Sequence, residues 1–123
     1  MVELERYVIK IKVNGKEAEI ALKRILSPIS IERMYRSLPM SGLAIRSDSA
    51  VYISVDVEGM LESPAKTLNE GEVGLDVGNN MLMVALERTT ISSGRVTKLG
   101  TVLSGLESIR SITTGMKVLI EKA

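Results

Sequence analysis

A β-hairpin centred on Asn14-Gly15 is the feature that most constrains how this chain can fold. Apolar and polar side chains alternate on both sides of the dipeptide, over residues 7–13 and 18–22. Asn-Gly favours the two-residue turn that joins antiparallel strands, because both residues readily adopt a positive φ. Such a turn pairs apolar residues on one face and opposite charges on the other, whereas a slip of one residue would destroy both sets. The expected partners are Tyr7 with Leu22, Ile9 with Ile20, Ile11 with Ala18, Lys10 with Glu19, and Lys12 with Glu17.

Further short strands follow the hairpin, with turn signals between them. They are expected at residues 43–46, 50–57, 66–68, 73–75, 81–86, 100–103 and 116–121. Many short strands separated by turns are typical of all-β barrels and sandwiches. Residues 87–98 are polar and are expected to form a surface loop, a kind of segment that often carries binding residues. A length of 123 residues fits one domain, so we predict a single, mainly β domain over residues 1–123.

Two short helices are expected among these strands. Ser27 is predicted to cap the first, with Pro28 in its first turn and Pro39 ending it. Ser104 is predicted to cap the second, just before the final strand. Each helix carries one apolar stripe, which favours packing against the sheet. The stripes are Ile31, Met34, Tyr35 and Leu38 in the first helix, and Leu106, Ile109 and Ile112 in the second.

The composition excludes several kinds of active site. The chain has no Cys and no His. Disulfides, thiolate metal sites, cysteine nucleophiles and histidine acid–base chemistry are therefore ruled out. We expect no cofactor and no bound metal, although a site made of carboxylates alone stays open for a hard cation. Phe and Trp are also absent, so the core must be built from Ile, Val, Leu and Met.

Charge and hydropathy bear on partners and location. The chain has 16 basic and 15 acidic residues and a formal net charge of +1, which is too small to bind nucleic acid by charge alone. No apolar run approaches the ~20 residues that cross a bilayer, and the acidic N-terminus does not resemble a signal peptide. We therefore expect a cytoplasmic protein without nucleic-acid or membrane partners, with a composition that also suits a thermophile.

A glycine-rich stretch and a pair of methionines could each carry chemistry, and each also has a structural interpretation. The glycine-rich stretch 71–78 has neither the spacing of a dinucleotide fingerprint nor that of a phosphate loop. We interpret its glycines as turns and bulges. Met81 and Met83 either line an adaptable pocket or fill irregular gaps in the core, since Met serves both purposes.

Two charged groups have the same double interpretation. Four acidic residues either gather into one site, as acid, base or metal ligands, or lie on solvated strand faces and turns. Paired carboxylates act in chemistry only when they lie at fixed distances from each other. A basic group either binds an anion or is simply solvated. The acidic residues are Asp48, Asp56, Glu58 and Glu62, and the basic residues are Arg46, Arg88, Arg95 and Lys98.

Several short motifs form a recognisable set. They are Glu-Ser-Pro-Ala at 62–65, Gly-Glu-Val-Gly at 71–74, and the apolar strand 81–86 that leads into Thr89-Thr90. With the strand at 51–54, this set resembles a small cyclophilin-like family of bacteria and archaea. The strand and helix over residues 100–112 are similar to the C-terminal part of true cyclophilins. The resemblance implies a closed eight-stranded β-barrel with short helices covering its ends.

The resemblance also implies a function. True cyclophilins catalyse rotation about X–Pro bonds, using an arginine on a barrel strand and an aromatic floor beneath the proline ring. Arg46 resembles that arginine, whereas the Phe, Trp, His and Gln of the isomerase site have no counterpart here. We therefore predict a module that binds a peptide or small ligand without efficient catalysis, in a groove between the Arg46 strand and residues 92–98. Its expected ligand-binding residues are Arg46, Met81, Met83, Arg95 and Lys98.

Two alternatives stay open. A weak prolyl isomerase would use Arg46 as its catalytic residue, beside an aliphatic pocket. A homo-oligomeric structural protein would instead use an exposed apolar strand face, with Val8 and Ala21 as candidates. The pocket of the isomerase would be formed by Met81, Met83 or Leu103.

Overall fold

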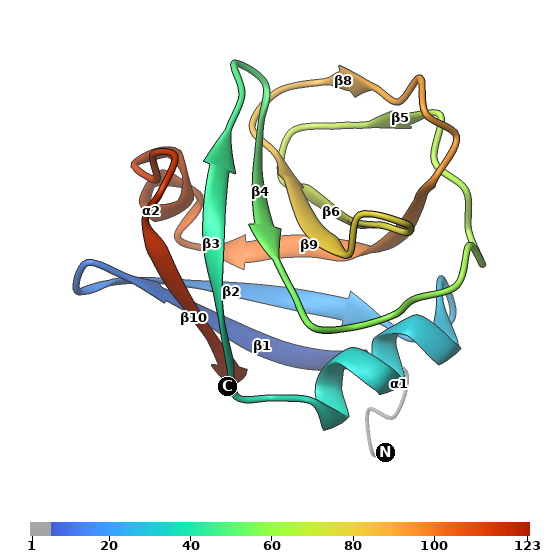
Figure 1. Cartoon of the computed structure of the whole chain (residues 1–123), viewed down its shortest axis with the longest axis horizontal. Helices are drawn as coiled ribbons and strands as arrows, with labels where there is room; N and C mark the ends of the chain where they lie inside the picture. Colours follow the sequence, from blue (N-terminus) through green and yellow to red (C-terminus); the bar gives the residue numbers. More distant parts are fainter. Residues whose placement is uncertain (1–5) are drawn as a thin grey trace.

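Eight antiparallel strands close into a barrel in the computed structural model, which describes residues 6–123 (Figure 1). Around the barrel the strand order is β1-β10-β3-β4-β7-β6-β9-β2. This confirms the prediction of a mainly β protein with a closed eight-stranded barrel. The barrel strands are β1 (Arg6–Val13), β2 (Lys16–Lys23), β3 (Met40–Arg46), β4 (Ala50–Ser54), β6 (Glu72–Asp76), β7 (Met81–Ala85), β9 (Val96–Ser104) and β10 (Lys117–Lys122).

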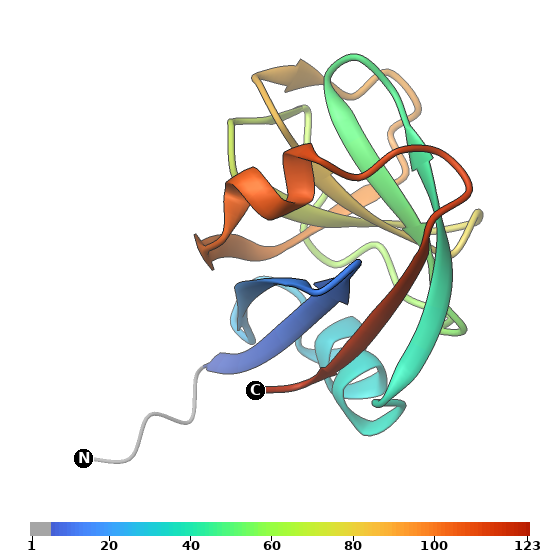
Figure 2. The same cartoon turned by 90° about the vertical axis from the view of Figure 1, so that its left-hand side faces the viewer.

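Two helices and a small second sheet accompany the barrel. The helices are α1 (Pro28–Arg36) and α2 (Leu106–Arg110), and they cover different ends of the barrel (Figure 2). Strands β5 (Thr67–Leu68) and β8 (Thr89–Thr90) pair only with each other. No helix within residues 6–123 is long and apolar enough to cross a membrane.

The β1–β2 hairpin has the register that its alternating pattern predicts. Ile9 pairs with Ile20 and Lys10 pairs with Glu19, and all five expected partnerships are present. Asn14 has a φ of 48° and Gly15 a φ of 76°, which are the positive values that a two-residue hairpin turn requires. The predicted turn and register are therefore both confirmed.

Aliphatic side chains fill the barrel. Inward-facing residues of all eight strands are buried, and α1 and the α2 region close the two ends with further apolar residues. Burying one such side chain stabilises the fold by about 1.5–3 kcal/mol. The fully buried members of this core include Ile9, Ile20, Ile53, Leu75 and Leu82 from the strands, and Ile31, Met34, Ile109 and Ile112 from the helical regions.

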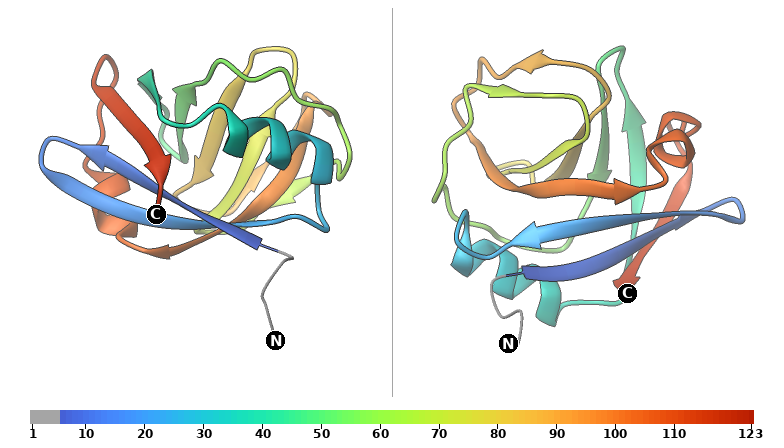
Figure 3. Two further views of the ribbon diagram at one scale, coloured as in Figure 1. Left: turned by 90° about the horizontal axis from the view of Figure 1, so that it is seen from below. Right: turned by 180° about the vertical axis from the view of Figure 1, so that it is seen from behind.

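A second layer covers part of the barrel's outer face. Strands β5 and β8 lie outside the wall formed by β4, β7 and β6 (Figures 1 and 3). Ile91 donates a backbone hydrogen bond to Lys66 within this layer, at 2.9 Å. The two layers enclose a small apolar cluster that is separate from the barrel interior, formed by Ala50, Ala65, Leu68, Met83, Ala85 and Val96.

The predicted N-cap position is confirmed for α1 and wrong for α2, and the hydroxyl of Ser27 does not make the expected capping hydrogen bond. Ser27 occupies the N-cap position of α1, but its hydroxyl is hydrogen-bonded to Thr97 Oγ1 at 2.8 Å and to the Lys98 carbonyl at 2.7 Å. Because this hydroxyl faces β9, it does not cap its own helix. The N-cap of α2 is Gly105, with a φ of 82°, and not Ser104, which is the last residue of β9.

The predicted surface loop at residues 87–98 is also corrected. Residues 89–90 form β8, and β9 begins at Val96, four residues before the predicted start of that strand. The polar Thr97 is fully buried in β9. Its burial is tolerated because its Oγ1 accepts hydrogen bonds from the backbone N–H groups of Glu62 and Ser63. The strand predicted at 50–57 ends earlier, at Ser54.

Candidate functional site

A small cavity lies between the outer face of the barrel and residues 89–96. Its volume is about 170 Å³, roughly the room for one amino-acid side chain and below the usual range of drug-sized pockets. The barrel contributes one residue from each of four neighbouring strands, β4, β7, β6 and β9, and the second layer contributes the opposite wall. The lining residues are Tyr52, Asp76, Met83 and Val96 from the barrel, and Thr89, Thr90, Ile91, Ser92 and Ser93 from the layer above.

Strand register places the floor of this cavity. Tyr52 of β4 is directly opposite Met83 of β7, which is opposite Gly74 of β6. Because side chains alternate between the two faces of a strand, all three positions face outward. A Cβ at Gly74 would lie 2.6 Å from Val96 Cγ1, so the glycine lets Val96 pack close to the barrel wall. This packing brings the end of the 89–96 segment against the sheet.

Asp76 gives the cavity an unusual polar group. Its Oδ2 accepts a hydrogen bond from the side-chain amide of Asn79, at 3.0 Å. Its Oδ1 is buried and accepts no hydrogen bond from any residue of the described chain. A buried carboxylate oxygen without a donor is costly, and buried polar atoms in native proteins are almost always paired. Asp76 is therefore set up to accept an N–H or O–H group.

Tyr52 complements Asp76 as a donor. Burial raises the pKa of the Tyr52 phenol above its ordinary value of 10.0, and the negative charge of Asp76 raises it further. The phenol therefore keeps its proton near neutral pH and can donate a hydrogen bond. The cavity thus combines a proton donor, a negatively charged acceptor and the apolar side chain of Met83.

Four of the five predicted binding residues lie on or near this side of the barrel. Met83 lines the cavity, and Met81 lies two residues before it on the same outward face of β7. Arg95 immediately precedes Val96, and its guanidinium lies beside Gly78 in the β6–β7 turn. Lys98 pairs with Gly74 on the outer face of β9. Of these four residues, only Met83 lines the cavity. Met83 also belongs to the small apolar cluster, so both interpretations of this methionine hold.

Arg46 lies apart from the other four residues. Its strand neighbour Ile45 faces outward opposite Tyr52, whereas Arg46 itself pairs with Val51, whose side chain is in the barrel core. The Arg46 guanidinium donates hydrogen bonds to the carbonyls of Arg110, at 2.6 Å, and Ile112, at 3.1 Å. The predicted groove between Arg46 and residues 92–98 is therefore not formed, because the two lie on opposite faces of the sheet.

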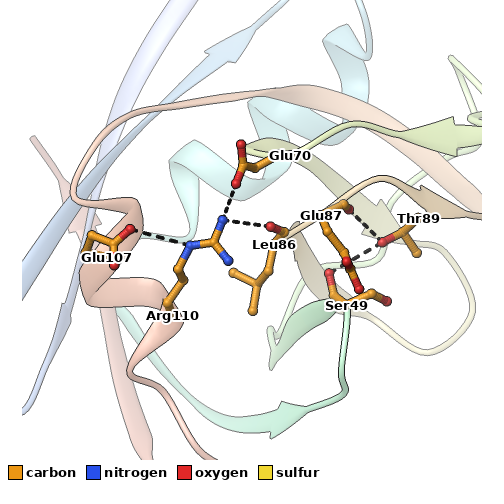
Figure 4. A network of polar contacts seen from close by, with 7 residues as sticks. All are labelled: Ser49, Glu70, Leu86, Glu87, Thr89, Glu107 and Arg110. Atoms are coloured by element: carbon orange, nitrogen blue, oxygen red, sulfur yellow. Dashed lines mark hydrogen bonds and ion pairs between the residues drawn. The ribbon is translucent and has the colours of Figure 1, made fainter.

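A second arginine joins Arg46 in fixing α2. Figure 4 shows the Arg110 guanidinium between Glu107 of its own helix, Glu70, and the carbonyl of Leu86, to which it donates a hydrogen bond of 2.8 Å. Its partners come from three separate segments of the chain. This network fastens α2 to the β5–β6 turn and to the end of β7, which is a structural role.

The acidic residues considered from the sequence do not gather. Asp48, Asp56 and Glu58 are exposed, whereas the Glu62 carboxylate accepts hydrogen bonds from the backbone N–H groups of Ile29 and Ser30. Within residues 6–123 there is no group of three or more acidic side chains that could hold a metal ion. Ala21, considered as an oligomer surface, is 1% exposed and is not available for contact.

Sequence reasoning missed Tyr52 and Asp76 as site residues. Alternation along the strand separates Tyr52 from the core residues Val51 and Ile53, but no pattern in the sequence shows that another segment covers the face on which Tyr52 lies. Asp76 lies in the glycine-rich stretch that was interpreted as turns. The signal that could have found the site was the serine-rich segment after β8, since Ser92 and Ser93 do line the cavity.

Comparisons with known proteins identify the fold. No protein-family model matches the chain, and a search of curated protein sequences finds no match. The solution structure of a hypothetical protein from Archaeoglobus fulgidus is similar, with a TM-score of 0.81, 19% identity, and coverage of 97% of this chain and 96% of that one. The crystal structure of the Mimivirus cyclophilin is similar at a TM-score of 0.57 and 12% identity, over 99% of this chain and 90% of that one. The barrel is therefore cyclophilin-like, as the sequence motifs implied.

Proposed function

From the cyclophilin-like barrel and the cavity on its outer face, we propose that this protein binds a peptide side chain or a small ligand without efficient catalysis. The observation that carries the proposal is the buried Oδ1 of Asp76, which has no donor among the described residues although it belongs to a residue that lines the cavity. A ligand N–H group would satisfy this oxygen and recover the cost of its burial.

The residues that line the cavity support one kind of ligand. Asp76 favours a cationic or amide N–H group, because hydrogen bonds that involve a charged partner are the stronger ones. Met83 and Ile91 suit a short aliphatic chain behind that group. A volume of about 170 Å³ admits one side chain rather than a large cofactor. A lysine or arginine side chain, or a short free amine, meets all three conditions.

An exposed apolar path leads to the cavity and supports a peptide as the source. Ile45 is 48% exposed on the outer face of β3, directly opposite Tyr52, and Leu43 is 58% exposed on the same face. Apolar side chains that remain exposed in a row beside a pocket are typical of binding surfaces. A peptide that inserted one side chain beside Tyr52 would cover Ile45 with its next residues.

The proposal can be tested by NMR titration of the labelled protein with n-butylammonium and with n-butanol. We expect butylammonium to shift the backbone amides of Tyr52, Asp76, Met83 and residues 90–93, with a weaker effect from the neutral alcohol. Asp76→Asn should remove this preference, because it keeps the shape of the side chain and loses its charge. The exposed Asp48→Asn is the matched control and should titrate like the wild type. Equal binding by wild type and Asp76→Asn would refute the proposal.

The isomerase alternative makes a different prediction. The similarity to the Mimivirus cyclophilin suggests an assay with a proline-containing peptide. Arg46 would have to leave the carbonyls of Arg110 and Ile112 to reach a substrate, so we expect no acceleration above the uncatalysed rate. An acceleration that Arg46→Lys abolishes, with the fold intact by circular dichroism, would favour the isomerase.

A further inference from the structure

A larger hollow lies beside the tip of the β1–β2 hairpin, which projects from the side of the barrel (Figures 1 and 3). Its volume is about 470 Å³, within the range of small-molecule sites. None of its lining residues lines the Tyr52 cavity. They are Lys12, Val13, Asn14, Gly15, Lys16, Glu17, Ser41, Lys117 and Leu119.

Strand register explains the shape of this hollow. Leu119 of β10 lies opposite Lys12 of β1 on one side and opposite Ser41 of β3 on the other. The small Ser41 leaves room above the sheet, whereas the long side chains of Lys12 and Lys117 form walls. The floor is therefore apolar and the walls are basic.

The charge of the hollow is positive. Lys12 is neutralised, because its ammonium group lies 2.8 Å from Glu121 and 4.0 Å from Glu17. Lys16 and Lys117 form no ion pair with any carboxylate of residues 6–123. Of the charged side chains that line the hollow, three are lysines and one, Glu17, is a carboxylate. The lining therefore has a net positive charge, which attracts anions.

A second hollow of about 180 Å³ continues the first one along β3. It shares Ser41 and Lys117 with the larger hollow and adds Leu43, which is 58% exposed. The continuous surface therefore offers ammonium groups beside two apolar side chains, Leu119 and Leu43. This pairing of features suits a ligand that is anionic and aliphatic at once.

We propose that this lysine-lined hollow is a binding site for a small aliphatic carboxylate. The ammonium group of Lys117 would pair with the carboxylate, with Lys16 adding to the positive charge of the lining. The Ser41 hydroxyl would donate a hydrogen bond to the carboxylate, and Leu119 and Leu43 would pack against the aliphatic chain. A free organic acid and an acidic side chain of a peptide share this chemistry. The site shares no lining residue with the Tyr52 cavity, which favours a cation.

Two probes distinguish these sources in a titration followed by NMR at constant ionic strength. Sodium glutarate represents the free acid, and the capped tripeptide acetyl-Glu-Leu-Glu-amide represents the peptide. We expect saturable shifts confined to residues 12–17, 41–43 and 117–119. The probe that saturates at the lower concentration identifies the source. If glutarate and the tripeptide cause no larger shifts than sodium chloride at equal ionic strength, the site is refuted.

Charge reversal at an exposed wall residue supplies the second readout. Lys117→Glu should raise the Kd for the better probe by about tenfold or more, because an attraction becomes a repulsion. Lys23→Glu is the control, because it makes the same change in charge at the end of β2 that lies away from the hairpin turn and the hollow. It should alter the Kd by less than about twofold, since exposed charges at long distance are screened. Equal Kd values for Lys117→Glu and Lys23→Glu would also refute the site.

Discussion

At the scale of single residues, Gly100 shows how closely the barrel strands approach one another. A Cβ at this position would lie 1.8 Å from the carbonyl oxygen of Ala21 on β2, which is a backbone atom. The neighbour cannot move aside without disturbing the β2–β9 ladder, whose register already shifts at Glu19 and Ile20. Glycine is therefore needed here for space.

We expect Gly100→Ala to lower the free energy of unfolding by about 1–3 kcal/mol or more, the usual cost of overpacking. Urea denaturation measures this loss. Gly94→Ala is the control, because a Cβ at Gly94 would meet no neighbouring atom. Gly94 has a φ of 70°, and the Gly94→Ala variant therefore shows the cost of backbone strain alone, about 1–2 kcal/mol. A Gly100→Ala protein no less stable than the control would contradict the argument from space.

At the scale of secondary structure, α1 depends on a residue far away in the chain. The Glu62 carboxylate accepts hydrogen bonds from the N–H of Ile29 at 2.9 Å and of Ser30 at 2.8 Å. These donors lie in the first turn, where a helix leaves its N–H groups without partners of its own. The negative charge also complements the positive end of the helix dipole. Glu62 thus does for α1 what Ser27 was expected to do.

The pKa of Glu62 makes this cap sensitive to acid. Burial tends to raise the pKa, but the hydrogen bonds from Ile29 and Ser30 and the charge of Arg33 outweigh burial, so the pKa is lowered from 4.5. A lowered pKa in the folded state means that the stabilisation is complete above about pH 4.5 and is lost as the pH falls through the folded value. The cap should therefore be intact at neutral pH.

We expect Glu62→Ala to lower the free energy of unfolding by about 1 kcal/mol at neutral pH, the typical value of a helix cap. The difference from wild type should narrow as the pH falls below about 4.5, where Glu62 is protonated first in the unfolded chain and then, at lower pH, in the folded protein. Urea denaturation at a series of pH values gives both results. Glu58→Ala, at a nearby exposed carboxylate, should show neither effect. A difference that stays constant with pH would show that the charge of Glu62 is not what stabilises the helix.

At the scale of the whole molecule, the structure consists of a closed barrel and a lighter outer layer. Closure gives every barrel strand two hydrogen-bonded neighbours, which removes exposed strand edges. The outer layer pairs β5 with β8 at only two positions and encloses a small apolar cluster. The layer that covers the candidate site is thus held by fewer interactions than the barrel beneath it.

We expect the outer layer to open without the barrel unfolding. The amide of Ile91, which donates to Lys66 in this layer, should exchange its hydrogen at least about tenfold faster than the protected amides of the β4–β7 ladder. Hydrogen exchange followed by NMR measures both. Exchange of Ile91 as slow as that of the ladder would mean that layer and barrel form one cooperative unit. Local opening would give a ligand access to Tyr52 and Asp76.

The sequence by itself determined the features that depend on near neighbours. The alternation around Asn14-Gly15 specified the hairpin and its register, because a period of two and a tight turn leave one arrangement that pairs Lys10 with Glu19 and Lys12 with Glu17. The missing Cys, His, Phe and Trp specified an aliphatic core and excluded several chemistries. Short motifs were enough to suggest the barrel that the structure confirms.

Only the tertiary structure decided which distant residues meet. Glu62 caps α1, Arg46 donates to the carbonyl of Arg110 in α2, and residues 89–96 fold over Tyr52 and Asp76. Local patterns show which face of a strand a side chain occupies, but not which segment will cover that face. That choice depends on the order in which the strands close around the barrel, which is settled by the packing of the whole chain.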